Sequence, residues 1–356
     1  MSSHNLNLRV IITVRLIMNR FEQNTSLDIN LLGSSGQTLL HTATEHESIG
    51  SVKVLVENPR TDVNIARLRD GATPLYFAAF RGSITILKML LALPQVDVNK
   101  QANYGQTPLL ASIMFGKEDC VLALLNDNRT NVNQSAHDGR TPLWCAARGG
   151  RNDCLELLLN HKNINVRALS INGETALHGA VLNGHYYCVY NILKFTPHDV
   201  NTRDQQGATP LMLAASLGRQ EIIRMMLLSN FSDTFNTFPS WKATVMTALL
   251  CNAFFASKLP VLVWKFIFSF LRPCVDVNKP MTFDYLSDDN DDLQPGATAL
   301  WLAAARGHAL CVQLLLAHQS IDTNQPDQSG LTPLDIAKKN NHLLCVELLT
   351  STTIRK

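Results

Sequence analysis

Short apolar stretches with helical spacing recur along the chain, separated by polar turns. In Ile84–Leu91, apolar residues stand three and four positions apart, as they do on one face of a helix. A second apolar stretch, Leu75–Ala79, lies just before it and follows directly after Thr-Pro. The pattern therefore predicts short helices that come in pairs.

The predicted helix pairs repeat with a nearly constant period. Thr-Pro-Leu and looser variants of it mark the start of each unit, at Thr38, Thr73, Thr107, Thr141, Thr175, Thr209, Thr247, Thr298 and Thr332. Six of the eight spacings between these threonines are 34 or 35 residues. A fixed period of this length is typical of helical solenoids, so we expect an all-α repeat array.

Each recurring position within the repeat has a physical reason. A threonine such as Thr73 can cap the first helix with its hydroxyl, and the proline after it fits the first helical position. Glycine stands nine residues after six of the threonines, as at Gly82, where it suits a left-handed turn. Alanine pairs such as Ala78-Ala79 leave room for close stacking, and exits such as Asp97–Asn99 turn the chain towards the next unit.

These residues resemble the ankyrin repeat. The fullest copies are GATPLYFAAFRGSITILKMLLALPQVDVN at Gly71–Asn99 and GRTPLWCAARGGRNDCLELLLNHKNIN at Gly139–Asn165. The resemblance covers nearly the whole chain, with about nine repeats. It implies an ankyrin repeat solenoid of helix-turn-helix units joined by β-hairpin-like fingers.

The period divides the chain into four parts. Residues 1–30 fit a half-repeat that caps the N-terminus, residues 31–228 hold regular repeats, and residues 297–350 hold the C-terminal repeats and cap. The period breaks in residues 229–296, where we expect a degenerate repeat with insertions. Within it, the apolar run Leu259–Leu271 is either a lengthened second ankyrin helix or similar to the first helix of an F-box.

Charge and composition exclude several classes of function. The chain has 31 basic and 29 acidic residues without a basic block, which argues against a nucleic-acid partner. Its hydrophobic content of 46% is too high for a disordered chain. The run Ala243–Leu271 is interrupted by polar residues, so a membrane span is not expected. The N-terminal stretch lacks the apolar core of a secretory signal, although its arginines also fit a mitochondrial presequence.

Cysteine and histidine could in principle form metal or catalytic sites, but their phase in the repeat favours burial. Five cysteines stand thirteen residues after a motif threonine, where other repeats have isoleucine: Cys120, Cys154, Cys188, Cys311 and Cys345. His41 and His178 stand at the histidine of the family motif Thr-Pro-Leu-His, where the resemblance implies a structural role. His137 lies in a finger tip and should be exposed.

Other chemical motifs are absent or weak. The sequence has no phosphate-binding glycine loop, nucleophile elbow, HExxH or CxxC motif. The acidic stretch Asp284–Asp292 lacks the glycine and the glutamate that an EF-hand calcium loop requires. We therefore expect no enzyme activity, no metal site and no cofactor.

The resemblance also implies where a partner binds. Ankyrin arrays contact partners through finger tips and the concave side of the first helices. Carried over to this chain, these places are Arg69, Asp70, Phe80, Arg81, Tyr104, Met114, Phe115, His137, Asp138, Arg148 and Leu182. Several of them are aromatic, Met or Leu, as in the core of a protein interface. The alternative is that another part of this chain covers them.

We therefore expect an interaction scaffold that binds a protein partner whose identity the sequence does not give. The main alternative is a ubiquitin-ligase substrate adaptor, in which Leu259–Leu271 recruits the cullin-adaptor subunit. A self-associating array is a third. We expect a cytoplasmic protein. Asn-rich arrays of this kind also resemble ankyrin effectors of intracellular bacteria, which would place the protein in the host cytoplasm.

Overall fold

The computed structural model describes residues 28–196, 200–228, 275–282, 294–318 and 320–353. Within these ranges the regular structure is helical and contains no β-strand, in agreement with the expected all-α class. The chain divides into two units, and each is described by itself. Unit 1 comprises residues 1–146 and 151–171, and unit 2 comprises residues 147–150 and 172–356.

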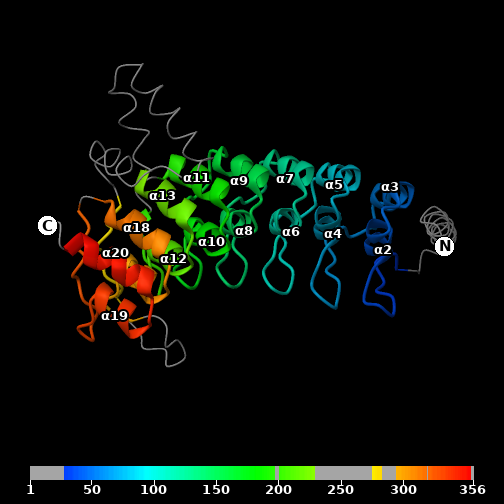
Figure 1. The fold of residues 1–356 in the computed structure, drawn as a ribbon. Helices are drawn as coiled ribbons and strands as arrows, with labels where there is room; N and C mark the ends of the chain where they lie inside the picture. Colours follow the sequence, from blue (N-terminus) through cyan, green and yellow to red (C-terminus); the bar gives the residue numbers. More distant parts are fainter. Residues whose placement is uncertain (1–27, 197–199, 229–274, 283–293, 319, 354–356) are drawn as a thin grey trace, which may run out of the picture. The chain divides into compact units, whose positions relative to one another are not determined.

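The helices come in antiparallel pairs of a first and a second helix (Figure 1). The first helices are α2 (Leu39–Glu45), α4 (Pro74–Arg81), α6 (Pro108–Met114), α8 (Pro142–Arg148), α10 (Ala176–Asn183), α12 (Pro210–Ser216), α17 (Ala299–Ala305) and α19 (Pro333–Lys339). The second helices are α3 (Ile49–Glu57), α5 (Ile84–Leu91), α7 (Glu118–Leu125), α9 (Asn152–Leu159), α11 (Tyr186–Phe195), α13 (Gln220–Leu228), α18 (Ala309–Leu316) and α20 (Leu343–Thr353).

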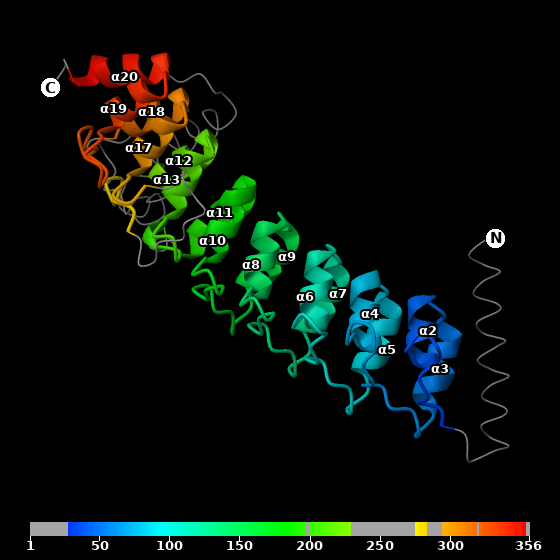
Figure 2. The ribbon, with the colours of Figure 1, turned by 90° about the horizontal axis from the view of Figure 1, so that it is seen from below.

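In unit 1 the pairs follow one another in register. Figure 1 shows α2, α4 and α6 in one row, α3, α5 and α7 in a second row, and the connecting fingers projecting on the side of the first helices. Figure 2 gives the same succession from the finger side. The face formed by the first helices and the fingers of unit 1 is called the first-helix face below.

The motif threonines begin the first helices as predicted. Thr73 has an extended backbone, and its side chain accepts a hydrogen bond from the backbone N–H of Tyr76. Pro74 occupies the first helical turn, where its missing N–H leaves no hydrogen bond unmade. The corresponding threonine of α17, Thr298, accepts from the N–H of Trp301 in the same way. These caps fix where each repeat starts, in unit 1 and in unit 2.

The glycines nine residues after the threonines are required for two reasons. Gly218 has a φ of +66°, a conformation that other residues adopt at a cost. In addition, a Cβ atom there would lie 2.8 Å from Nδ1 of His308, which is the N-cap residue of α18, the second helix of the next pair. The imidazole of His308 in turn bonds the carbonyl of Ser216, at the end of α12. The glycine thus admits the side chain that satisfies a free carbonyl at the helix end.

Asparagines in the exits connect successive repeats. The Asn64 side chain donates to the carbonyl of Gln95 and accepts from the N–H of Asp97, at 2.7 Å in each case. Asn99 makes the same two bonds to Arg129 and Asn131 in the next repeat. Each asparagine therefore fixes the spacing between two repeats by binding the backbone of the next repeat. The sequence analysis predicts only the turn at these exits, not this connection.

Small and apolar side chains fill the space between neighbouring pairs. The alanines of the motif are fully buried, among them Ala78, Ala146 and Ala214. The five in-phase cysteines are also buried, and none of them is in a disulfide. Burial raises the pKa of Cys188 to about 12, so this thiol stays protonated and unreactive at neutral pH. The predicted structural role of this set is confirmed.

The predicted role of the motif histidines is confirmed as well. His178 is fully buried, and its Nδ1 lies 2.8 Å from the hydroxyl of Thr175 while its Nε2 lies 3.2 Å from the carbonyl of Ala208 in the next repeat. Burial lowers the pKa of His178 to about 4, so the ring is neutral. His41 bonds Thr38 and Ala72 in the same manner.

The stack of unit 2 continues across the break in the period. Helix α17 packs directly on α12, and α18 packs on α13. Asn201 accepts a hydrogen bond from the N–H of Asp276, so the asparagine connection also spans the break. Residues 229–274 thus stand in the chain where a regular repeat has only Leu93–Gln95.

Several expectations for the irregular parts lie outside the described residues. These are the N-terminal cap up to residue 27, the repeat at Thr247, the run Leu259–Leu271 and the acidic stretch Asp284–Asp292. The described residues hold eight helix pairs, where about nine repeats were expected.

Candidate functional site

Three large apolar side chains are grouped on the first-helix face of unit 1. The rings of Phe80, from α4, and Phe115, directly after α6, meet edge to face with their centroids 4.4 Å apart. Phe115 is 46% exposed and Met114 is 42% exposed, while Phe80 is half-buried. We call these three residues the aromatic ridge. Their exposure agrees with the prediction that places seven and eight residues after the threonine face outwards.

A basic side chain accompanies the ridge on each of three repeats. The guanidinium of Arg81 lies over the ring of Phe80, 5.9 Å from its centroid. Lys117 packs its alkyl chain against Gly82, and Arg151 packs against Gly116 while donating to the carbonyl of Met114 at 3.2 Å. Only Arg81 was predicted among these. Lys117 and Arg151 stand ten residues after their threonines, the place of His308, and this shared phase would have revealed them.

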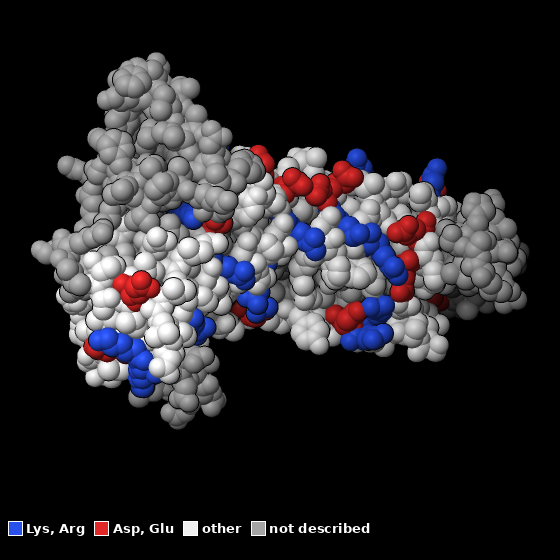
Figure 3. Space-filling model, viewed as in Figure 1, with Lys and Arg blue, Asp and Glu red and all other residues white. Residues whose placement is uncertain are grey.

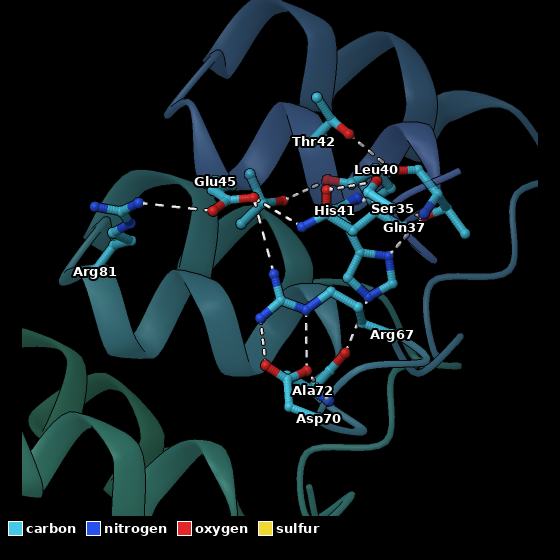
Figure 4. A network of polar contacts seen from close by, with 12 residues as sticks. Ser35, Gln37, Leu40, His41, Thr42, Glu45, Arg67, Asp70, Ala72 and Arg81 are labelled. Carbon is cyan, nitrogen blue, oxygen red and sulfur yellow. Dashed lines mark hydrogen bonds and ion pairs between the residues drawn. The ribbon is translucent and has the colours of Figure 1, made fainter. Parts of the chain in front are cut away.

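The end of the ridge towards α2 contains a network of charged side chains (Figure 4). Glu45 accepts from the side chain of Gln37 at 2.8 Å and lies 3.9 Å from Arg81 and 4.0 Å from Arg67. Arg67, from the finger, also pairs with Asp70, which lowers the pKa of that carboxyl. The network joins α2, a finger and α4, so these side chains are held in place before any partner arrives.

Two further arginines lie against aromatic rings closer to the fingers. Arg67 stands over Phe77 with its guanidinium carbon 4.2 Å from the ring centroid. Arg140 stands over Trp144 at 4.7 Å and forms an ion pair of 3.2 Å with Asp138. Such contacts hold the flat face of a guanidinium while its edge remains able to donate hydrogen bonds.

The predicted finger residues fall into two groups. Arg69, Tyr104 and His137 are exposed, and Tyr104 is 73% exposed. Asp70 and Asp138 are instead held inside their own fingers, because each carboxylate binds an arginine and a backbone N–H of the same turn. The sequence could not show these pairs, since they depend on the folded shape of the finger.

The remaining two predicted residues lie in unit 2. Leu182 and Arg148 are both half-buried, and their carbonyls accept hydrogen bonds from Arg219 and Asn183. The structure therefore brings together Phe80, Met114, Phe115 and Arg81 in unit 1, and places Leu182 and Arg148 in the other unit.

Within the described part of the chain, no group of three or more metal-binding side chains is found. None of the helices described there is long and apolar enough to cross a membrane. Burial is the main cause of the pKa shifts of the cysteines Cys120, Cys154 and Cys188 and of His178 in the repeat core. The exposed side chains described on the first-helix face are thus apolar, positively charged or able to form hydrogen bonds.

Comparison with known proteins identifies the family. A sequence model described as ankyrin repeats (3 copies) matches residues 12–102, 91–169, 165–237 and 274–356. The chain belongs to the ankyrin repeat family. The ankyrin solenoid is similar to the crystal structure of the ankyrin repeat domain of Bcl-3, described as a unique member of the IkappaB protein family. That match has 27% sequence identity and a TM-score of 0.53, and it covers 62% of this chain and 97% of that chain. No curated protein matches the sequence significantly.

Membership of this family has a direct meaning for function. Ankyrin repeats form a protein–protein interaction scaffold and are generally non-enzymatic. The framework residues of each repeat are occupied with capping and stacking, as described above. In an ankyrin array, the side chains of the first helices and fingers that neither cap nor stack can therefore contact a protein partner.

Proposed function

We propose that this chain is a non-enzymatic scaffold whose first-helix face in unit 1 binds a protein partner, with the aromatic ridge at the centre of the contact. The observation that carries the proposal is the exposure of Met114 and Phe115 beside Phe80. Aromatic and Met side chains in contact with arginine are enriched at the energetic centres of protein interfaces. Contiguous exposed apolar patches that polar side chains surround often mark protein interaction sites.

The architecture supports binding at low entropic cost. Phe80 and Phe115 restrain one another through their edge-to-face contact, and Arg81 is held between Phe80 and Glu45. Side chains that are ordered before binding lose less conformational freedom when the partner arrives. Affinity should then come from a few anchors on the ridge. The exposed finger residues Arg69, Tyr104 and His137 would form the rim, and Leu182 and Arg148 would be a separate contact in unit 2.

The test is affinity capture with two matched triple variants. In the ridge variant, Phe80, Met114 and Phe115 are changed to Ala. In the control variant, three similarly exposed apolar residues of the second helices, Ile49, Val54 and Leu122, are changed to Ala. Both proteins and the wild type are immobilised, exposed to eukaryotic cytosol and compared by quantitative mass spectrometry.

We expect one or more proteins to be captured by the wild type and the control variant and to be lost with the ridge variant. Melting curves of all three proteins are compared, so that a loss of capture can be distinguished from a loss of fold. Capture that is equal with the ridge variant and the wild type would contradict the proposal. Capture that is lost only with the control variant would place the binding surface on the second helices.

The finer hypotheses have their own tests. A role as ubiquitin-ligase adaptor depends on Leu259–Leu271, outside the described residues, and requires a cullin-adaptor subunit among the captured proteins of all variants. A role as bacterial effector requires the protein in the host cytosol during infection. The cytoplasm fits the six described cysteines, because none of them is in a disulfide and five of them are buried.

A further inference from the structure

Cations border the aromatic ridge. Arg81, Lys117 and Arg151 come from three successive repeats and lie beside the ridge residues of their own or the preceding repeat. Figure 3 shows lysine and arginine side chains in a broken row over α4 and α6, with acidic side chains along the second-helix edge above them. The face is therefore apolar in one strip and cationic in the next.

The repeat framework positions this basic row. A Cβ atom on Gly82 would lie 2.8 Å from Cδ of Lys117, so the lysine stem rests on the backbone at the end of α4. The Arg151 guanidinium rests on Gly116 in the same way and donates to the carbonyl of Met114. This bond uses one of the five N–H groups of the arginine, and the residue is exposed.

Few anions of unit 1 neutralise the row. Arg81 has one acidic neighbour within ion-pair distance among the described residues, Glu45 at 3.9 Å, and Glu45 also faces Arg67. Lys117 and Arg151 have no ion pair within 4.0 Å in the described ranges. The acids that follow them in sequence, Glu118 and Asp153, lie beside one another instead, and this proximity raises the pKa of Glu118.

We propose that the ridge binds an acidic amphipathic protein segment, in which apolar side chains are flanked on one side by carboxylates. This inference rests on the proposed function and adds the chemistry of the partner. A purely apolar segment on the ridge would take the neighbouring cations out of water without a counter-charge, which is unfavourable. Carboxylates in that place gain charge-assisted hydrogen bonds and speed the encounter of the two molecules.

The acidic edge argues for a protein segment rather than a nucleic acid. A polyanion that continued past the basic row would meet Glu118 and Asp153, which are close enough to repel each other. A segment with a few carboxylates on one side can stop at the row and cover the ridge with its apolar side. The partner segment is therefore short, and its carboxylates face Arg81, Lys117 and Arg151.

The experiment is a selection from a random 16-residue peptide library displayed on phage, with the full chain as the target. Peptides that lose binding to the ridge variant are retained. We expect these peptides to carry a net negative charge, with Asp or Glu next to Phe, Leu, Ile or Trp. The strongest peptide is then synthesised and its dissociation constant is measured against wild type and charge-reversed proteins.

In the charge-reversed protein, Arg81, Lys117 and Arg151 are changed to Glu. In its matched control, three exposed lysines of unit 1 that lie on or after the second helices, Lys53, Lys88 and Lys162, are changed to Glu. We expect binding on the order of a hundredfold weaker for the first protein and within about twofold for the control, because only the first set faces the ridge. Arg81→Glu alone, which removes only the 3.9 Å ion pair with Glu45 between repeats, should weaken binding several-fold.

A charge-swapped peptide separates direct pairing from a loss of fold. When the Asp and Glu residues of the peptide are changed to Lys, it should bind the charge-reversed protein better than the wild type. Ridge-dependent peptides without an acidic excess would overturn the inference and leave the proposed function standing. A selection that yields no ridge-dependent peptide would overturn both. Ridge-dependent binding of a 20-nucleotide single strand that exceeds that of the peptides would also overturn it.

Discussion

Helices α4 and α6 of unit 1 share their framework with α12 and α17 of unit 2 but differ in what they expose. All four begin with a threonine cap and are followed by a glycine with positive φ. Eight residues after the threonine, however, unit 1 has Arg81 and Phe115, and unit 2 has Leu217 and Arg306. One residue earlier, Phe80 and Met114 correspond to the small side chains of Ser216 and Ala305.

The comparison separates residues that make the fold from residues that are free to make contacts. Framework positions are occupied by the same residue types in both units because caps, left-handed turns and close stacking allow few alternatives. The two outward positions have no such duty, and in α4 and α6 they carry Phe80, Met114 and Phe115. A substitution at a framework position should therefore lower the stability of whichever unit contains it. A substitution at an outward position should weaken binding only if the residue belongs to the aromatic ridge.

The largest effect is expected from a charge placed in the stack. Ala146→Asp in unit 1 and Ala303→Asp in unit 2 affect fully buried alanines five residues after their threonines. Each would bury an unpaired carboxylate and should cost roughly 3–5 kcal/mol of stability. Thermal unfolding followed by circular dichroism checks this. If one variant melts like the wild type, its alanine does not lie between helices and the common framework is disproved for that unit.

The next largest effect is expected from acid. The pKa of His178 is about 4 in the folded chain and 6.5 for an ordinary histidine, so the unfolded chain binds the proton more readily. Stability is therefore full above pH 6.5 and falls as the pH decreases towards 4, by about 3 kcal/mol in total. Urea unfolding between pH 7.5 and 4.5 should show a weaker pH dependence in His178→Gln. The exposed His137→Gln serves as control, and identical slopes for both variants would refute the assignment.

The third prediction concerns the break in the period. Because α17 packs directly on α12, replacing residues 229–274 by Leu-Pro-Gln, the sequence of Leu93–Gln95, should leave the stack intact. Loop entropy changes by only about 0.6 kcal/mol per doubling of length, so we expect a gain of no more than about 2 kcal/mol. Thermal melting measures it. A clear loss of stability in the shortened chain would mean that the stack depends on the removed residues.

The smallest effects distinguish two glycines of the same phase. At Gly116 a new methyl group would meet the flexible tip of Arg151 at 3.3 Å, and Gly116→Ala should cost about 1 kcal/mol through its positive φ. At Gly218 the methyl would also displace the His308 ring, so Gly218→Ala should cost about 2 kcal/mol. Denaturant midpoints decide between them, and a smaller loss at Gly218 would contradict the direct packing of α17 on α12.

The sequence predicts the framework well because each framework residue acts locally. A threonine before Pro74 caps a helix, and a glycine at position 82 makes a left-handed turn, whatever lies farther away. The burial of Cys188 follows from its phase alone. Exposure of Met114 and Phe115 follows in the same way, because the phase that buries one set of side chains exposes another.

What the sequence does not predict depends on contacts between distant residues. The pairing of Asp70 with Arg67 needs the folded finger, and it changes Asp70 from a contact residue into a structural one. The packing of α17 on α12, across the break in the period, is another contact between distant residues. Likewise, the phase of Lys117 identifies its place in the repeat, but its contact with the glycine of the preceding repeat needs the folded stack.

The most direct test of the account compares one outward position in the two units. Phe115 and Leu217 both stand eight residues after their threonines and are 46% and 37% exposed. The dissociation constant of a partner captured through the ridge is measured for Phe115→Ala, Leu217→Ala and wild type. We predict binding about 30-fold weaker for Phe115→Ala, as for a central interface anchor, and unchanged binding for Leu217→Ala. Equal affinity of Phe115→Ala and wild type, or a greater loss in Leu217→Ala, would contradict the account.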